Sequence, residues 1–403
     1  MIFIVGVVLF ALGIGLSVAL HEAGHMFTAK WFGMKVRRYF IGFGPKIFSF
    51  RRGETEYGLK AIPGGGFCDI AGMTALDEIT PEEEPRAMWK YPAWKRVIVM
   101  SAGSITHFLL GFLILYIMAV TMGLPNLLDK PIVNSVQQCV VNDGDNVDTT
   151  NPKCGPNDPA PARNAGLQAG DRLIAVNGVA TPTWTDLVKA VQQLEGPQRI
   201  TIDRNGAEQT VTVDIPKVQR KVRNADGTTT MKDLGAIGVL KQQTFEYNAV
   251  SGIGGAASFT GDMFAKTWEG LLRFPERIPA VIKAIGGGQR DPDTPVSVVG
   301  ASILGGDAVE RGLWDVVLLL LASLNFFIGV FNLLPLLPLD GGHIAVIVYE
   351  KIRNAIRRLR GQPAGGPVDY SKLMTVTMVV VFIGGAVMLL TITADIVNPI
   401  RLN

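Results

Sequence analysis

The sequence carries little charge and few chemically reactive side chains for its length. Of its 403 residues only 18% are charged, and it holds four histidines and three cysteines. The net charge of +3 is too small to suggest a nucleic-acid partner. Internal repeats and low-complexity tracts are also missing from the sequence. With 48% hydrophobic residues, the composition favours a membrane protein of two or three domains over one soluble globule.

What the chain has in quantity is long apolar runs. Four of them approach the ~20 residues that cross a bilayer, at 1–20, 97–124, 316–339 and 373–394. The first lacks the basic start and the small-residue cleavage site of a signal peptide, so we expect it to be kept as a span. Lysine and arginine gather after the first run and between the third and the fourth, which places both connections in the cytoplasm by the positive-inside rule. Both chain ends and the stretch 125–315 are then expected outside.

The first apolar run leads into His21-Glu22-Ala23-Gly24-His25. Residues four apart share a helix face, so His21 and His25 can bind one metal ion while Glu22 lies beside them as a base for metal-bound water. Zn²⁺ suits two imidazoles, a carboxylate and a water. In a soluble helix the same pattern could be a chance surface cluster. Ionisable residues in an apolar span are costly to place, however, and are functional as a rule.

The third run ends in a stretch that contains Asn332, Pro335, Pro338 and Asp340. Prolines break a helix and free backbone groups that need partners in protein or in a polar cavity. Asp340 is therefore expected at the cytoplasmic end of its span, at the depth of the histidine motif. Alone it could be a carboxylate that ends a helix at the interface. Beside a two-histidine site that lacks a third ligand, we predict that it completes the metal site.

Three further regions have patterns of their own. Residues 33–72 are typical of short strands interrupted by glycines, and Pro63-Gly64-Gly65-Gly66 indicates a close approach by another backbone. Residues 74–90 are acidic and are expected to form a solvated connector. Residues 259–285 have an amphipathic pattern, which is expected to lie on the outer membrane surface.

Residues 128–242 are expected to form a separate soluble module. They predict a strand between two turns, then a helix, then a hairpin, at 165–178, 184–194 and 200–215. This order resembles a PDZ domain of the bacterial protease-associated type. The alternative is a small β-domain without a ligand. A polar insertion at 142–161 is predicted to be a loop.

The cysteines and the histidine of the second span each allow two interpretations. Cys139 and Cys154 lie around the polar insertion on the expected outer, oxidising side, so we predict a disulfide between them. Cys68, beside the glycine-rich loop, could either supply a thiolate to the open zinc position or line the substrate groove, which we favour. His107 could be a metal ligand, but a hydrogen bond to a neighbouring helix is the favoured prediction.

Together these motifs resemble the site-2 proteases. More narrowly, they resemble the bacterial regulator-of-sigma-factor proteases that cut membrane-bound anti-sigma factors. The resemblance covers nearly all of the chain and is carried by His-Glu-Ala-Gly-His, the Pro-Gly-Gly-Gly loop, one PDZ-like module and Asn-x-x-Pro-x-x-Pro-Leu-Asp-Gly. The chain departs from the best-known member, which has two tandem PDZ domains. It also carries Gly103-Ser104 and His107 where many members have Gly-Pro and a later Asn.

The resemblance implies an intramembrane zinc metalloendopeptidase. His21, His25 and Asp340 would bind Zn²⁺, Glu22 would be the general base, and Asn332 would contact the substrate backbone. The substrates would be single-pass membrane proteins, with anti-sigma factors foremost, that an upstream site-1 protease has already cut outside the bilayer. The PDZ domain would gate their access. The 33–72 sheet would partly enter the membrane and offer an edge to an unwound substrate.

The expected fold is a multi-pass α-helical membrane protein with four transmembrane helices, a membrane-associated β-hairpin sheet and an extracytoplasmic α+β PDZ domain. The expected location is the cytoplasmic membrane, with the active site near the cytoplasmic side. The first half of the chain is expected to contain a span with the zinc motif (1–32), a cytoplasmic or membrane-re-entrant β region with its acidic connector (33–96), a second span (97–124) and the PDZ domain (128–242). The second half is expected to contain outer amphipathic helices (243–312), a third span with the third zinc ligand (313–345), a basic cytoplasmic loop (346–372) and a fourth span (373–397).

Two other classes of function compete with this interpretation. One is a zinc enzyme of the soluble zincin type that membrane anchors merely tether. The other is a non-catalytic scaffold whose PDZ domain binds chain ends. Ligands drawn from two spans argue against the first. Glu22 argues against the second, because a structural metal site has no need of a base.

Overall fold

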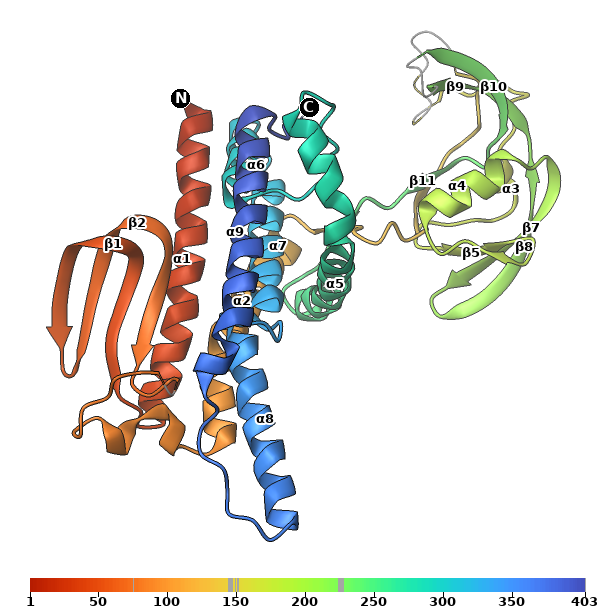
Figure 1. Cartoon of the computed structure of the whole chain (residues 1–403). Coiled ribbons are helices and arrows are strands. Elements are labelled where there is room, and N and C mark those ends of the chain that lie inside the picture. Colours follow the sequence, from red (N-terminus) through yellow and green to blue (C-terminus); the bar gives the residue numbers. More distant parts are fainter. Residues whose placement is uncertain (75, 144–147, 149, 151, 224–227, 403) are drawn as a thin grey trace. The chain divides into compact units, whose positions relative to one another are not determined.

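The computed structural model describes the chain except for residues 75, 144–147, 149, 151, 224–227 and 403. The chain divides into two compact units, Met1–Met122 with Ala249–Asn403 and Gly123–Asn248 (Figure 1). We call them the helical unit and the β unit. Each has its own core, and each is described separately.

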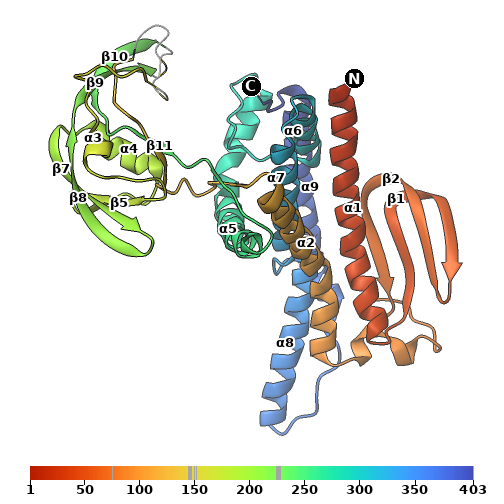
Figure 2. The ribbon, with the colours of Figure 1, turned by 180° about the vertical axis from the view of Figure 1, so that it is seen from behind.

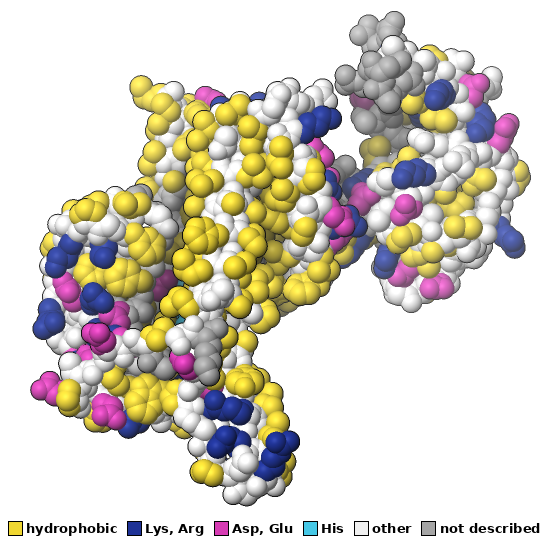
Figure 3. Space-filling view, viewed as in Figure 1, with side chains coloured by type: hydrophobic (Ala, Val, Ile, Leu, Met, Phe, Trp, Pro, Cys, Tyr) yellow, Lys and Arg dark blue, Asp and Glu magenta, His cyan; other side chains and the backbone are white. Residues whose placement is uncertain are grey.

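The helical unit contains the four predicted spans. Its long helices are α1 (Ile2–Trp31), α2 (Ala93–Thr121), α5 (Ser251–Ile285), α6 (Val298–Glu310), α7 (Trp314–Asn332), α8 (Asp340–Leu359) and α9 (Met374–Val397), with short 3₁₀ turns at Glu84–Arg86, Met88–Lys90 and Tyr370–Leu373. Among the described residues, α1, α2, α7 and α9 are long and apolar enough to cross a membrane. The two chain ends lie at the same end of this unit (Figures 1 and 2). Hydrophobic side chains cover much of the visible face of its helices (Figure 3).

Helix α6 packs against the first half of α1 through glycine. A Cβ on Gly305 would lie 2.5 Å from the Phe10 ring, and one on Gly306 would lie 2.5 Å from Val7 Cγ2. Small residues let helix backbones approach closely in membrane proteins, where dispersion contacts drive association. The sequence predicts amphipathic helices throughout 243–312. Helix α6 differs from that prediction because its glycines and alanines are buried.

The predicted third span and basic loop need a correction. Helix α7 ends at Asn332, and a new helix, α8, begins at Asp340 and runs to Leu359 through much of the region predicted as a loop. Its buried stripe includes Ile347, and Glu350 forms a 2.8 Å ion pair with Arg96 of α2. Because both charges are largely buried, this pair fixes α8 against α2.

The region predicted as several short strands is one hairpin of two long strands, β1 (Val36–Arg52) and β2 (Thr55–Ile70). Both strands bend, so Tyr39 in the first half of β1 pairs with Cys68 on one side and Tyr57 on the other. At the bend of β1, Gly42 and Gly44 have φ of 86° and 78°, which side chains other than glycine rarely adopt. Sequence periodicity cannot show that one strand serves two neighbours.

The acidic connector is less solvated than predicted. Arg37 of β1 binds Asp77 at 2.7 Å and Asp69 at 2.9 Å, and Arg86 binds Glu54 at 2.6 Å. Met88, which follows the acidic run, is only 1% exposed. The connector is therefore packed onto the hairpin.

The β unit is an α+β fold around a four-stranded antiparallel sheet of order β6-β5-β7-β8. Its elements are β3 (Leu124–Pro125), β4 (Val133–Val136), α3 (Pro161–Asn164), β5 (Arg172–Val176), β6 (Val179–Ala180), α4 (Trp184–Gln192), β7 (Gly196–Arg204), β8 (Ala207–Ile215), β9 (Lys217–Arg223), β10 (Thr229–Gly235), β11 (Val239–Lys241) and β12 (Thr244–Phe245). The predicted strand, helix and hairpin are all present. The core joins Leu187 of α4 to Leu173 and Ile200 of the sheet.

The predicted disulfide is confirmed, because Cys139 and Cys154 are joined and their Cα atoms lie 5.8 Å apart. Residues 144–147, 149 and 151 of the predicted 142–161 loop lie outside the described residues. The described part of that insertion has no helix before Pro161.

The buried Asp171, the residue before β5, forms an ion pair with Arg204 of β7 in the β unit. Its carboxylate is 1% exposed and accepts two 2.7 Å hydrogen bonds from Arg204. Burial raises the pKa of this carboxyl, but the bonds from Arg204 and from the Gln168 N–H lower it more, so the folded pKa lies below its usual value. The stabilisation is then present above about pH 4 and is lost as the pH falls through the lowered pKa.

We predict that Asp171→Asn lowers the Tm of the isolated 123–248 fragment by about 5–10 °C at pH 7, because a charge-assisted pair is broken. The difference from wild type should shrink as the pH falls below about 4 and through the lowered pKa of Asp171, because the protonated carboxyl loses its charge. Circular dichroism melts at several pH values test this, with the exposed Asp214→Asn as control. An equal loss of Tm in both variants would contradict the prediction.

Candidate metal centre

The two histidines of the motif lie on one face of α1. The helix runs unbroken from Ile2 to Trp31, because it is rich in apolar residues and contains no proline. His21 and His25 are each 6% exposed, one turn apart, and their Nε2 atoms lie 3.1 Å from each other. The spacing of four residues therefore gives the shared face that the sequence predicted.

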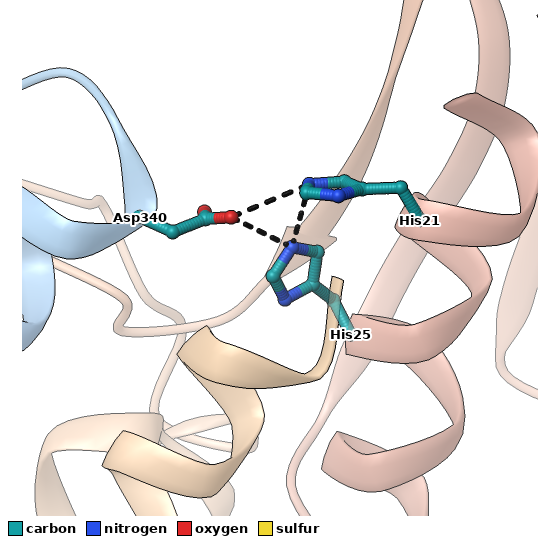
Figure 4. A group of neighbouring side chains, drawn as sticks. All are labelled: His21, His25 and Asp340. Carbon is teal, nitrogen blue, oxygen red and sulfur yellow. Dashed lines mark hydrogen bonds and ion pairs between the residues drawn. The ribbon is translucent and has the colours of Figure 1, made fainter. Parts of the chain in front are cut away.

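Asp340 meets both histidines from another helix. Its Oδ2 atom lies 3.3 Å from His21 Nε2 and 3.3 Å from His25 Nε2 (Figure 4). Asp340 is the first residue of α8, and the turn before it is packed closely onto this helix start. A Cβ on Gly341 would lie 2.3 Å from the Leu333 carbonyl oxygen. The Asp-Gly sequence thus allows the carboxylate to reach α1.

The donor atoms fit a cation. His25 Nδ1 lies 2.7 Å from the Val99 carbonyl, so this nitrogen carries the proton and Nε2 presents a lone pair. Asp340 Oδ2 is buried and accepts no hydrogen bond. Two ligand atoms at ~2.1 Å from a tetrahedral Zn²⁺ lie about 3.4 Å apart, which matches the observed spacing. In the described part of the chain, these three residues are the group that could hold a metal ion.

The other predicted site residues occupy different places. Glu22 interacts electrostatically with both imidazoles and with Asp340, and it also interacts with the Cys68 backbone. The Cys68 thiol does not join the metal-binding group but packs among apolar side chains. Asn332 is the last residue of α7 and is half-buried.

Sequence reasoning missed the contribution of α2. A Cβ on Gly103 would lie 2.4 Å from His21 Cε1 and 2.5 Å from His25 Nε2. A Cβ on Gly24 would lie 2.7 Å from the Ala102 carbonyl oxygen. These glycines let α1 and α2 pack closely at the depth of the metal centre. The signal in the sequence is weak, because a glycine in an apolar helix has several other uses.

Comparison with known proteins identifies the family. The profile of peptidase family M50 matches residues 9–376. The chain belongs to peptidase family M50. It is 47% identical to the zinc metalloprotease Rip1 of Mycolicibacterium smegmatis and 46% identical to that of Mycobacterium tuberculosis (strain H37Rv), in each case over the whole of both chains. A putative zinc metalloprotease of Brucella suis is 28% identical over 84% of each chain.

Membership of family M50 excludes one of the two competing classes of function. The chain is a zinc metalloendopeptidase rather than a non-catalytic scaffold. The converging nitrogen and oxygen lone pairs suit Zn²⁺, which polarises a carbonyl group and acidifies a bound water. The four apolar helices fit a multi-pass membrane protein.

We predict that Gly103→Ala weakens zinc binding at least about 10-fold, because a methyl group would displace imidazoles that have no other position in the packed bundle. Zinc affinity can be measured by chelator competition on the purified protein. Gly15→Ala on α1 is the matched control, since nothing lies within 4 Å of its added carbon. Equal affinity in both variants would show that α2 does not shape the centre.

Proposed function

We propose that this M50 peptidase hydrolyses single-pass membrane proteins, anti-sigma factors foremost, within or near their membrane span after a first cut outside the bilayer. The observation that carries the proposal is a metal-binding group on a candidate span, with His21 and His25 on α1 and Asp340, the first residue of α8, 3.3 Å from both. A tethered enzyme of soluble type would need no ligands inside its anchors. The resemblance to the regulator-of-sigma-factor proteases supports the substrate class.

The proposed roles follow from the chemistry of each side chain. His21, His25 and Asp340 would hold Zn²⁺, which supplies a polarised, acidified water. Glu22 would accept a proton from this water and pass it to the leaving amine. Glu22 follows His21 on α1, and its carboxyl group interacts electrostatically with both imidazoles and with Asp340. The apolar helices around it exclude bulk water, which strengthens these interactions.

The β1–β2 hairpin is proposed to present the substrate. Residues 66–70 of β2 pair on one side, with 36–41 of β1, and no other strand pairs with them in the described sheet. The second edge of this segment is therefore open to an extended peptide. Gly66 lies against the base, since a Cβ there would be 3.0 Å from Glu22 Cγ. Asn332, at the end of α7, is proposed to contact the substrate backbone.

The proposed orientation places both chain ends and the β unit outside the cytoplasm. Chain ends that lie together at one end of the helical unit support it. Basic residues on α8, at the other end of this unit in Figure 3, support a cytoplasmic position for that helix by the positive-inside rule. The enzyme is accordingly proposed to reside in the cytoplasmic membrane, with the zinc centre near the cytoplasmic side.

The β unit is proposed to be a PDZ domain that restricts access of substrates. Its helix and antiparallel sheet follow the order expected for that fold, and its division from the helical unit supports an independent role. A large outer domain on a substrate would be excluded, and a trimmed substrate would be admitted. The competing role is capture of the new chain end left by the first cut.

Glu22→Gln should keep about one equivalent of zinc and abolish cleavage, because an amide cannot accept the proton. His21→Ala, His25→Ala and Asp340→Ala should lose the metal instead. Single-pass anti-sigma factors truncated outside their span are the substrates, and metal content is measured on the same samples. The exposed Glu276→Gln on α5 is the control. Cleavage by Glu22→Gln at the wild-type rate would refute the assignment.

Replacing 123–248 by a flexible linker should let the enzyme cut untrimmed anti-sigma factor, because the proposed size filter is gone. Gel analysis of trimmed and untrimmed substrate side by side tests this, with zinc content as a measure of folding. A zinc-loaded deletion variant that still rejects the untrimmed substrate would rule out the filter. Slower cutting of trimmed substrate would favour capture of the chain end.

A further inference from the structure

Two nitrogen atoms beside the metal centre are buried without a partner. They are Nδ1 of His21 and Nε2 of His107, which lies on α2 one turn after Gly103. His107 is only 1% exposed. The two imidazole rings lie 5.0 Å apart between centroids, at an angle of 42°. Buried polar atoms without partners are rare in proteins, so this pair calls for an explanation.

The hydrogen bonds around the rings determine which nitrogen carries each proton. Asn325 of α7 donates from Nδ2 to the Leu321 carbonyl at 2.8 Å, which fixes the orientation of its amide. Its Oδ1 atom, 2.8 Å from His107 Nδ1, must then accept a hydrogen bond from that nitrogen. The proton of neutral His107 is therefore on Nδ1, and Nε2 presents a lone pair.

His21 has the complementary arrangement when it binds metal. Its Nε2 atom faces Asp340 and His25, so a ligand role for Nε2 leaves the proton on Nδ1. A metal-bound histidine almost always donates its other N–H to an acceptor. His25 follows this rule through the Val99 carbonyl. For His21, the buried acceptor without a partner is His107 Nε2.

The spacing of the rings suits a hydrogen bond between them. An N···N separation of ~2.9 Å added to two imidazole radii of ~1.1 Å puts the centroids about 5 Å apart. The observed separation is 5.0 Å, which is the centroid separation that such a hydrogen bond requires.

We propose that His107 is a positioning residue of the zinc centre, which accepts a hydrogen bond from His21 Nδ1 and is itself oriented by Asn325. The series Asn325–His107–His21 then connects α7, α2 and α1 to the metal. This inference rests on the proposed role of His21 as a zinc ligand. It gives a function to a histidine for which the family resemblance supplies none.

The test measures zinc affinity of the purified full-length protein by chelator competition. His107→Leu should weaken binding about 10–100-fold, as loss of such outer partners does elsewhere. His107→Gln should recover most of the affinity, because its amide oxygen reaches as far as the imidazole Nε2. Ser104→Ala is the matched control, since Ser104 Oγ is another buried atom without a partner on α2. It should bind zinc as wild type does.

A second measurement separates positioning from direct ligation. The visible absorption bands of the Co²⁺-substituted protein report the number of ligands, and they should keep their shape in His107→Gln. Loss of a nitrogen ligand in that variant would identify His107 as a ligand and overturn the proposal. Wild-type zinc affinity in His107→Leu would overturn it as well.

If His107→Leu fails to fold, Asn325→Leu replaces it, and unchanged affinity in that variant has the same meaning. His21→Ala distinguishes this inference from the proposed function. If His21→Ala loses zinc while His107→Leu keeps the wild-type affinity, the proposed positioning role of His107 is wrong and the proposed zinc site still stands.

Discussion

The helical unit is arranged around three atoms with lone pairs, His21 Nε2, His25 Nε2 and Asp340 Oδ2, which lie within 3.3 Å of one another among apolar helices. Like partial charges at this separation repel, and the repulsion is strong where the dielectric constant is low. A cation between them converts the repulsion into coordination. The arrangement is therefore more easily understood as a metal site than as part of the apolar core.

Close helix packing makes this convergence possible. Gly24 and Gly103 remove the side chains that would separate α1 from α2, and Gly341 lets the 333–339 turn pack onto the start of α8. The break between α7 and α8 matters for the same reason. A single straight helix through 332–340 would carry Asp340 past the histidines, whereas the turn ends with the carboxylate facing them (Figure 4).

Sequence reasoning predicted what depends on composition and local spacing. It predicted the four apolar helices, the shared face of His21 and His25, and the approach of Asp340, which follows the α7 run, to both histidines. The predicted hydrogen bond from His107 to a neighbouring helix is confirmed, but the sequence could not identify Asn325 as its partner. That partner and the double pairing of Tyr39 depend on how helices and strands meet in the folded chain. Helix α8 was missed because its arginines resembled a loop rich in charge, although they complement the dipole at its C-terminus.

X-ray absorption at the zinc edge of the purified, zinc-loaded protein tests the central claim most directly. The account predicts nitrogen and oxygen neighbours at ~2.0–2.2 Å, no sulfur at ~2.3 Å, and a changed spectrum in Asp340→Ala. A sulfur neighbour at that distance would place Cys68 on the metal and contradict the three-residue site. A spectrum that stays the same without the Asp340 carboxylate would contradict it equally.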